Sequence, residues 1–189
     1  MGVVIGIYQL RQQRNLSKTQ AQREAYRIAG ERCDYYGREV IPLDILLTKE
    51  MEASNCELLK KCKVDVSDEG ISIKPEGITK DDAEKMNLHA EKLSKCINSV
   101  EGFAVFFVTG VADDNVGFLT CGRAFVGFFE KYLPVYAMSN SLEHHAKATQ
   151  TLYSRWKGRI RQLELVAQQE EIKKKLNPKK AKPAKPFGC

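Results

Sequence analysis

Residues 79–100, TKDDAEKMNLHAEKLSKCINSV, form the most clearly amphipathic stretch of this sequence. Thr79 is followed three residues later by Asp82, so the pair has the spacing of a capping box at a helix N-terminus. Apolar residues then recur every three or four positions and share one helix face: Ala83, Met86, Ala90, Leu93, Ile97 and Val100. The spacing predicts a helix whose apolar face is buried in a helical body.

Two further helices are predicted before this stretch. Ser17 and Gln20 have capping-box spacing, and apolar residues at helical intervals follow as far as Tyr36. Pro42 suits the first turn of a second helix because its missing N–H is not needed there. The apolar stripe of that second helix continues to Cys62.

A short hairpin is predicted next. Val64, Val66, Ile71 and Ile73 alternate with polar residues on either side of a turn at 68–70. Alternation with a period of two is typical of paired strands that bury one face.

Residues 102–133 allow two interpretations. The run 103–108 is too short for periodicity to separate a buried strand from a buried helix, and its β-branched residues favour a strand. Residues 116–121 are predicted to pair back as a second strand, before a helix over 123–133. Seven of the eight phenylalanines lie between Phe103 and Phe129, and they form either the core or a docking surface. The candidate partner-binding residues here are Phe125, Phe128 and Phe129.

The last predicted helix is long and extends beyond a small body. Asn140 and Glu143 have the spacing of its N-terminal cap, and about 30 residues of helix span about 45 Å. Its apolar stripe therefore needs a partner over part of its length. The candidate partner-binding residues on it are Leu152, Trp156, Leu163 and Val166.

Charge is segregated to the two ends of the chain. All 24 acidic residues lie between Glu24 and Glu171, so the net charge of +6 comes from the ends and the middle is mildly acidic. The C-terminal candidate anion-binding residues are Lys173, Lys174, Lys175, Lys179, Lys180, Lys182 and Lys185. Cationic tracts of this kind fit RNA phosphate or anionic lipid headgroups. Residues 1–23 fit either an organellar targeting segment or a solvated arm.

No metal, cofactor or catalytic site is predicted. Residues 65–76 carry acidic positions near the spacing of a calcium loop, but Pro75 stands where the exit helix would begin. His144 and His145 are adjacent on a helix and point about 100° apart, so they do not chelate one metal together. The six cysteines contain no CxxC pair, which favours reduced thiols in a reducing compartment.

The predicted fold class is mainly α with a minor β component (α+β), in which a compact body with a hairpin precedes a protruding helix. The predicted divisions are a basic arm over 1–16, a body over 17–133, a long helix over 134–176 and a Lys- and Pro-rich tail over 177–189. No transmembrane helix and no secretory signal are expected, so the location is predicted to be intracellular.

The predicted function is a non-catalytic accessory or architectural subunit of a multi-protein assembly, positioned by its cationic ends. A membrane-associated mitochondrial complex is one setting for such a subunit. The first alternative is a ribonucleoprotein component that binds RNA through the basic tail. The second is an enzyme whose site is assembled only by the fold, using Cys121 or His89.

Overall fold

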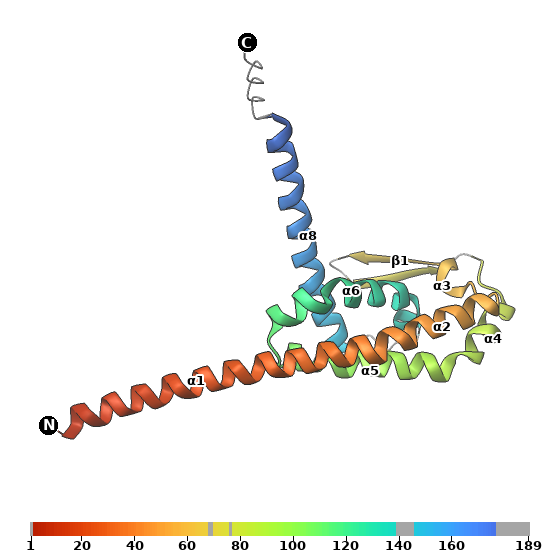
Figure 1. Ribbon diagram of the computed structural model, residues 1–189. Helices are drawn as coiled ribbons and strands as arrows, with labels where there is room; N and C mark the ends of the chain where they lie inside the picture. Colours follow the sequence, from red (N-terminus) through yellow and green to blue (C-terminus); the bar gives the residue numbers. More distant parts are fainter. Residues whose placement is uncertain (1, 68–69, 76, 139–145, 177–189) are drawn as a thin grey trace, which may run out of the picture.

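The computed structural model describes residues 2–67, 70–75, 77–138 and 146–176, and helices account for most of them (Figure 1). The elements in chain order are α1 (Gly2–Tyr35), the π-helix η1 (Tyr36–Val40), α2 (Ile41–Ala53), α3 (Leu58–Lys61), β1 (Cys62–Ser67), β2 (Gly70–Pro75), α4 (Lys80–Leu88), α5 (Ala90–Val108), α6 (Asp114–Met138) and α8 (Lys147–Leu176).

Helices α1, η1 and α2 form one continuous rod from residue 2 to residue 53. Pro42 explains the π-helical segment, because a proline within an α-helix lacks the N–H and clashes with the carbonyl four residues earlier. The wider turn relieves this clash, and the N–H of Ile41 donates to the Tyr36 carbonyl five residues back. The predicted break between two helices near Gly37 is therefore wrong, as is the predicted start at Ser17, since α1 already includes Gly2.

The α+β class is also wrong. Strands β1 and β2 form an antiparallel pair in which Val64 lies opposite Ile73. Each of them pairs only with the other among the described residues. Helices make up nearly all of the rest of the described body, so the protein is a helical fold and the strand pair is an addition at its side (Figure 1).

The capping box at Thr79 is confirmed. The backbone N–H of Asp82 donates to Thr79 Oγ1 over 3.2 Å, and the backbone N–H of Thr79 donates to Asp82 Oδ2 over 2.9 Å. The single helix predicted over 79–100 is instead two helices, α4 and α5, that meet at His89. Met86, Leu93 and Val100 are buried as predicted, whereas Ala83 and Ala90 are exposed and Ile97 is half-buried.

The strands predicted at 103–108 and 116–121 are wrong, because α5 and α6 cover both segments. Phe103, Ala104 and Phe107 are all buried, and their spacing of one and four residues places them on one helix face. The β-branched residues of this segment misled the prediction, since packing of the aromatic side chains outweighs strand propensity here.

The core is an aromatic cluster centred on Trp156 of α8. Its ring meets four phenylalanines edge-on, with centroid distances of 5.4 Å to Phe107 and 5.2 Å to Phe125 and slightly longer ones to Phe103 and Phe118. These rings come from α5 and α6, so Trp156 joins three helices. Edge-to-face pairs contribute about 0.5–1.5 kcal/mol each beyond area burial.

Two long helix ends project from this core in different directions (Figure 1). Residues 9–24 of α1 and residues 161–173 of α8 are exposed throughout. The predicted boundary at 16/17 falls inside α1, and the boundary at 133/134 falls inside α6. The predicted cap at Asn140 and Glu143 lies outside the described residues, as does the tail from residue 177.

Candidate functional site

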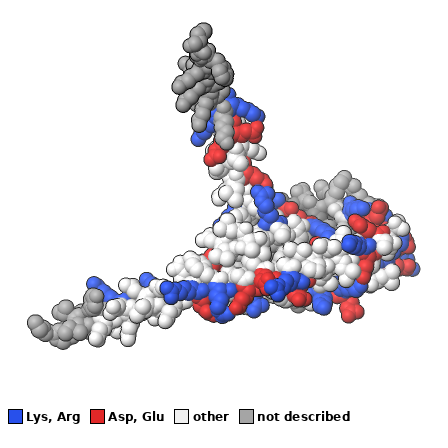
Figure 2. Space-filling view, in the orientation of Figure 1, with Lys and Arg blue, Asp and Glu red and all other residues white. Residues whose placement is uncertain are grey.

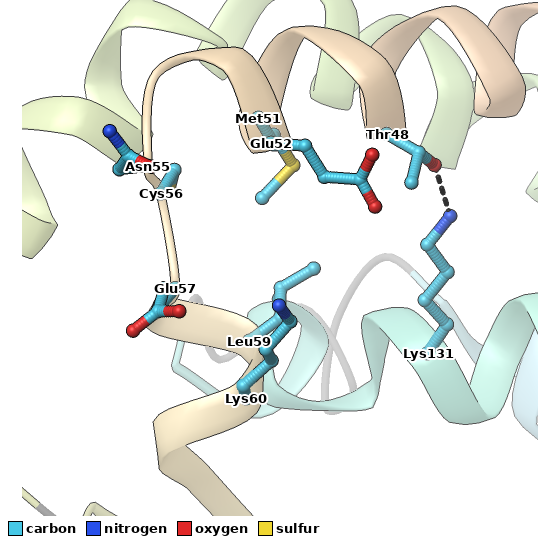
Figure 3. Close-up of a pocket in the computed structure, with 9 residues that line it drawn as sticks. All are labelled: Thr48, Met51, Glu52, Asn55, Cys56, Glu57, Leu59, Lys60 and Lys131. Carbon is cyan, nitrogen blue, oxygen red and sulfur yellow. Dashed lines mark hydrogen bonds between the residues drawn. The ribbon is translucent and has the colours of Figure 1, made fainter.

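A hollow of about 360 Å³ lies at the C-terminal end of α2, between α2, α3 and α6 (Figure 3). Figure 3 shows Met51 and Glu52 entering it from α2, Leu59 and Lys60 from α3, and Lys131 from α6. The remaining lining residues are Thr48, Asn55, Cys56 and Glu57. No sequence pattern predicts this hollow, because its walls come from α2 and α3 on one side and from α6, far along the chain, on the other.

Lys131 is fixed at the edge of the hollow by partners on α2. Its Nζ donates to Asp44 Oδ1 over 2.6 Å and to the Thr48 hydroxyl. The Tyr132 hydroxyl donates to the same Asp44 oxygen over 2.8 Å. Burial, and then the Asp44 carboxylate, raise the pKa of Tyr132, so the phenol stays neutral. This network ties α2 to α6, and it leaves the Lys131 ammonium already paired.

The hollow offers both charged and apolar groups to a ligand. Glu52 and Glu57 supply carboxylates, Lys60 supplies an ammonium, and Met51 and Leu59 supply apolar contact. No histidine is among the residues that line it, so the Cys56 thiol has no imidazole base beside it there.

A second cluster joins Ser54, His89 and Glu50 and superficially resembles a serine hydrolase triad. Ser54 Oγ lies 2.9 Å from His89 Nε2, and His89 Nδ1 lies 3.8 Å from Glu50 Oε2. The second distance is too long for the hydrogen bond that orients a catalytic imidazole. Ser54 also donates its hydroxyl proton to the Met51 carbonyl over 3.0 Å, so His89 acts as the donor to Ser54. Glu50 pairs with Lys92 instead.

This cluster therefore connects helix ends. Ser54 follows the last residue of α2, and His89 is the junction between α4 and α5. His89 is buried, so its hydrogen bond satisfies a polar group inside the body. The arrangement explains why a histidine without metal ligands at helical spacing stands at this position.

The Cys33 thiol has a lowered pKa, because of its hydrogen bond with Cys121, but its side chain is buried. Burial raises the pKa of Cys96 to about 12 and also raises the pKa of Cys62. A hydrogen bond with Cys33, together with burial, raises the pKa of Cys121. A catalytic thiol needs a lowered pKa together with access to the substrate, because the thiolate is the nucleophile. Cys33 has the lowered pKa but is only 6% exposed. The enzyme alternative stays a prediction without a supporting site in the described part of the chain.

Most of the predicted partner-binding residues lie in the core. Phe125, Phe128, Phe129, Leu152 and Trp156 are buried by the chain's own helices, so in this structure they form the core. In a sequence, large aromatic side chains are compatible with either a core or a docking surface. The packing of α5, α6 and α8 decides between these two.

The other two predicted partner-binding residues lie on the outer end of α8. Leu163 is 53% exposed and Val166 is 52% exposed. Leu165 and Ile172, which lie off the predicted apolar stripe, are exposed to a similar extent on the same helix end. Lys173 and Lys175 lie exposed beside them, whereas Lys174 is described only as part of the helix and Lys179, Lys180, Lys182 and Lys185 lie outside the described residues.

The outer end of α1 contains a cationic stripe. Arg11, Arg14 and Lys18 are spaced by three and four residues and therefore share one helix face. Figure 2 shows this end of the molecule with blue side chains and no red ones among the described residues. The outer end of α8 carries both colours (Figure 2).

The described helices include none that is long and apolar enough to cross a membrane, in agreement with the prediction. Among the same residues, no three His, Cys, Asp or Glu side chains come together in a way that could hold a metal ion.

No protein-family model, curated protein or solved structure matches this chain. The function is therefore argued from the geometry alone.

Proposed function

We propose that this protein is a non-catalytic accessory or architectural subunit of a multi-protein assembly, in which its projecting helix ends contact other subunits. The observation that carries the proposal is the exposed outer end of α8. Helices without tertiary packing are marginal in water, so a helix end of this length is expected to be stabilised by a neighbour.

The apolar face of α8 continues past the point where the body ends. Leu152, Trp156 and Ile160 are buried on one face of the helix. Leu163 and Val166 follow Leu152 by three and four helical turns, so both extend the Leu152 side of that face outward. A partner helix or groove that covers Leu163 and Val166 would continue the packing that the body begins.

The cationic stripe of α1 supports a role in positioning. Arg11, Arg14 and Lys18 face outward with no carboxylate before Glu24. An acidic subunit surface or an anionic lipid surface would attract this stripe, and screening by salt would weaken that attraction. The mitochondrial and membrane-associated setting stays a prediction from the sequence.

The test measures the mass of the complex in which the protein occurs natively. The chain tagged at its natural level is isolated under mild conditions and its sedimentation is compared with that of a Leu163→Ser/Val166→Ser double variant. We expect the wild type to sediment with other subunits, well above its own 21.4 kDa, and the double variant to be released. Leu88→Ser is the matched control, because Leu88 is 78% exposed on α4, away from α8.

The ribonucleoprotein alternative is favoured by one observation, the same Arg11, Arg14 and Lys18 stripe. Phosphate contacts by three cations predict RNA binding that weakens steeply as salt is raised. Absence of RNA binding in 50 mM salt would exclude this alternative and leave the assembly proposal untouched.

A further inference from the structure

A second hollow lies between α1 and α5. Its volume is about 610 Å³, within the size range of small-molecule sites. Arg32 and Tyr35 line it from α1. The residues from α5 share one helix face, at spacings of three or four: Lys95, Asn98, Ser99, Gly102, Phe103 and Phe106.

Arg32 carries an unsatisfied donor in this hollow. Its Nε is buried and has no hydrogen-bond partner among the described residues. The guanidinium carbon lies 3.9 Å from the centre of the Phe106 ring, so a cation–π contact holds the group in place. A buried donor without an acceptor is costly, and each such group in a folded protein requires an explanation.

The lining supplies donors and positive charge but no carboxylate. Arg32 and Lys95 are cations, and Asn98, Ser99 and Tyr35 can each donate a hydrogen bond. The acidic residues nearest along α1 are already engaged, since Glu31 pairs with Arg27 and Asp34 pairs with Arg38. Neither Arg32 nor Lys95 has an ion-pair partner in the described part of the chain. An oxyanion would satisfy both.

Aromatic side chains form the rest of the wall. Phe103 is fully buried beneath the hollow, Phe106 is half-buried, and Tyr35 is 37% exposed at its edge. No neighbouring atom lies within 4 Å of where a Gly102 side chain would begin, so the backbone is open to a ligand there. Charge at one side and aromatic surface at the other suit a small organic anion.

We propose that this hollow binds a small organic oxyanion, whose phosphate or carboxylate group contacts Arg32 and Lys95 and whose apolar part lies on Phe106 and Tyr35. The site is independent of the assembly proposed above, because its residues lie on the body and not on the projecting helix ends. Arg32 supplies the directional contact, since its guanidinium can donate two parallel hydrogen bonds to an oxyanion.

The test uses four probes with the full chain: phenyl phosphate, benzoate, inorganic phosphate and benzyl alcohol. Binding is followed by isothermal calorimetry and by amide shifts in two-dimensional NMR. We expect saturable binding of phenyl phosphate or benzoate with a Kd of about 1 mM or below. Inorganic phosphate should bind at least about tenfold more weakly, and benzyl alcohol should not saturate by about 10 mM.

Variants locate the site. Arg32→Gln should weaken phenyl phosphate binding at least about tenfold, and Lys95→Gln severalfold, because each removes a charge-assisted hydrogen bond. Arg32→Lys should recover part of the affinity, which separates charge from damage to the fold. Lys92→Gln is the matched control, since Lys92 lies on the same helix but pairs with Glu50 outside the hollow.

Three results would overturn the proposal. One is the absence of saturable binding by either aromatic anion up to about 10 mM. A second is unchanged affinity in an Arg32→Gln variant whose circular dichroism is that of the wild type. The third is equal affinity for phenyl phosphate and inorganic phosphate, which would show that the aromatic side chains do not contribute to binding.

Discussion

The two halves of α8 have the same secondary structure but opposite surroundings. Residues 147–160 place Thr149, Leu152 and Trp156 in the core, whereas residues 161–173 are exposed throughout. The inner half therefore stabilises the body, and the outer half gains nothing from it. A helix of this kind separates folding from binding along its own length.

The N-terminal end of the inner half is held by hydrogen bonds from the body as well as by packing. Both carboxylate oxygens of Glu101 accept backbone N–H groups there, from Ala148 over 3.1 Å and from Thr149 over 2.9 Å. They satisfy first-turn donors that the helix itself leaves free. Among its described side chains, the outer half has an exposed local pair of Glu171 with Lys175. Substitutions in the two halves should differ accordingly.

The largest expected difference is between Trp156→Ala and Leu163→Ala. Removing the central ring of the core should lower the free energy of unfolding by about 3–5 kcal/mol. Leu163→Ala should change it by less than about 0.5 kcal/mol, since that side chain is half exposed. Urea unfolding measures both values. Similar losses for the two variants would mean that the outer half also packs on the body.

A smaller loss is expected from Asp114→Ala. This carboxylate accepts from Trp156 Nε1 over 3.0 Å and pairs with Arg155 and Arg159, so it holds α8 against the start of α6. The variant should lose about 2 kcal/mol in urea unfolding, because half-buried donors lose their acceptor. Glu164→Ala on the outer half is the control and should be nearly neutral. An equally neutral Asp114→Ala would show that packing alone positions α8.

Two glycines contrast the core with the exposed face of the inner half of α8. A side chain at Gly117 would overlap the Phe107 ring in the core, whereas one at Gly158 would meet nothing within 4 Å. Gly117→Ala should therefore cost about 1–3 kcal/mol through overpacking. Gly158→Ala should be neutral or stabilise the helix by up to about 1 kcal/mol. Thermal unfolding measures the stability change of each variant. A loss of stability of similar size in both variants would contradict this packing.

The smallest effect concerns pH. Asp82 is buried, and hydrogen bonds from Lys61 Nζ at 2.9 Å and from Thr79 hold its pKa well below the ordinary value. Its contribution to stability is therefore present above about pH 4 and is lost as the pH falls below the pKa of an unfolded Asp. The stability difference between wild type and Asp82→Asn should shrink between pH 5 and pH 2.

Glu171→Gln on the outer half of α8 is the control for this experiment. The pair of Glu171 with Lys175 is exposed, so its removal should have little effect at either pH. A pH-independent loss in Asp82→Asn would show that the carboxylate charge is not what stabilises the start of α4.

Local signals in the sequence were sufficient for some elements. The Thr79 and Asp82 spacing located the start of α4, because a capping box depends only on residues three positions apart. The projecting C-terminal helix was also predicted, since its length exceeds what a small body can cover. The continuous rod of α1 and α2 was not, because a proline can be absorbed by a π-helical turn as well as by a break.

The candidate sites depended on contacts that a single sequence does not reveal. Leu163 and Trp156 belong to one apolar stripe. Trp156 is buried and Leu163 is not, because α5 and α6 pack only against the inner half of α8. The unsatisfied Nε of Arg32 likewise becomes visible only when Phe106 is placed against it. Periodicity identifies the faces of helices, and tertiary packing decides which of those faces are covered.

Hydrogen exchange across α8, with the isolated chain compared with the native assembly, tests the role of the outer half most directly. The amides of residues 161–173 should exchange quickly in the isolated chain, and those of residues 150–160 should be protected in both samples. In the native assembly the outer amides should become protected as well. Outer amides that exchange equally fast in both samples would contradict the proposal that this helix end contacts another subunit.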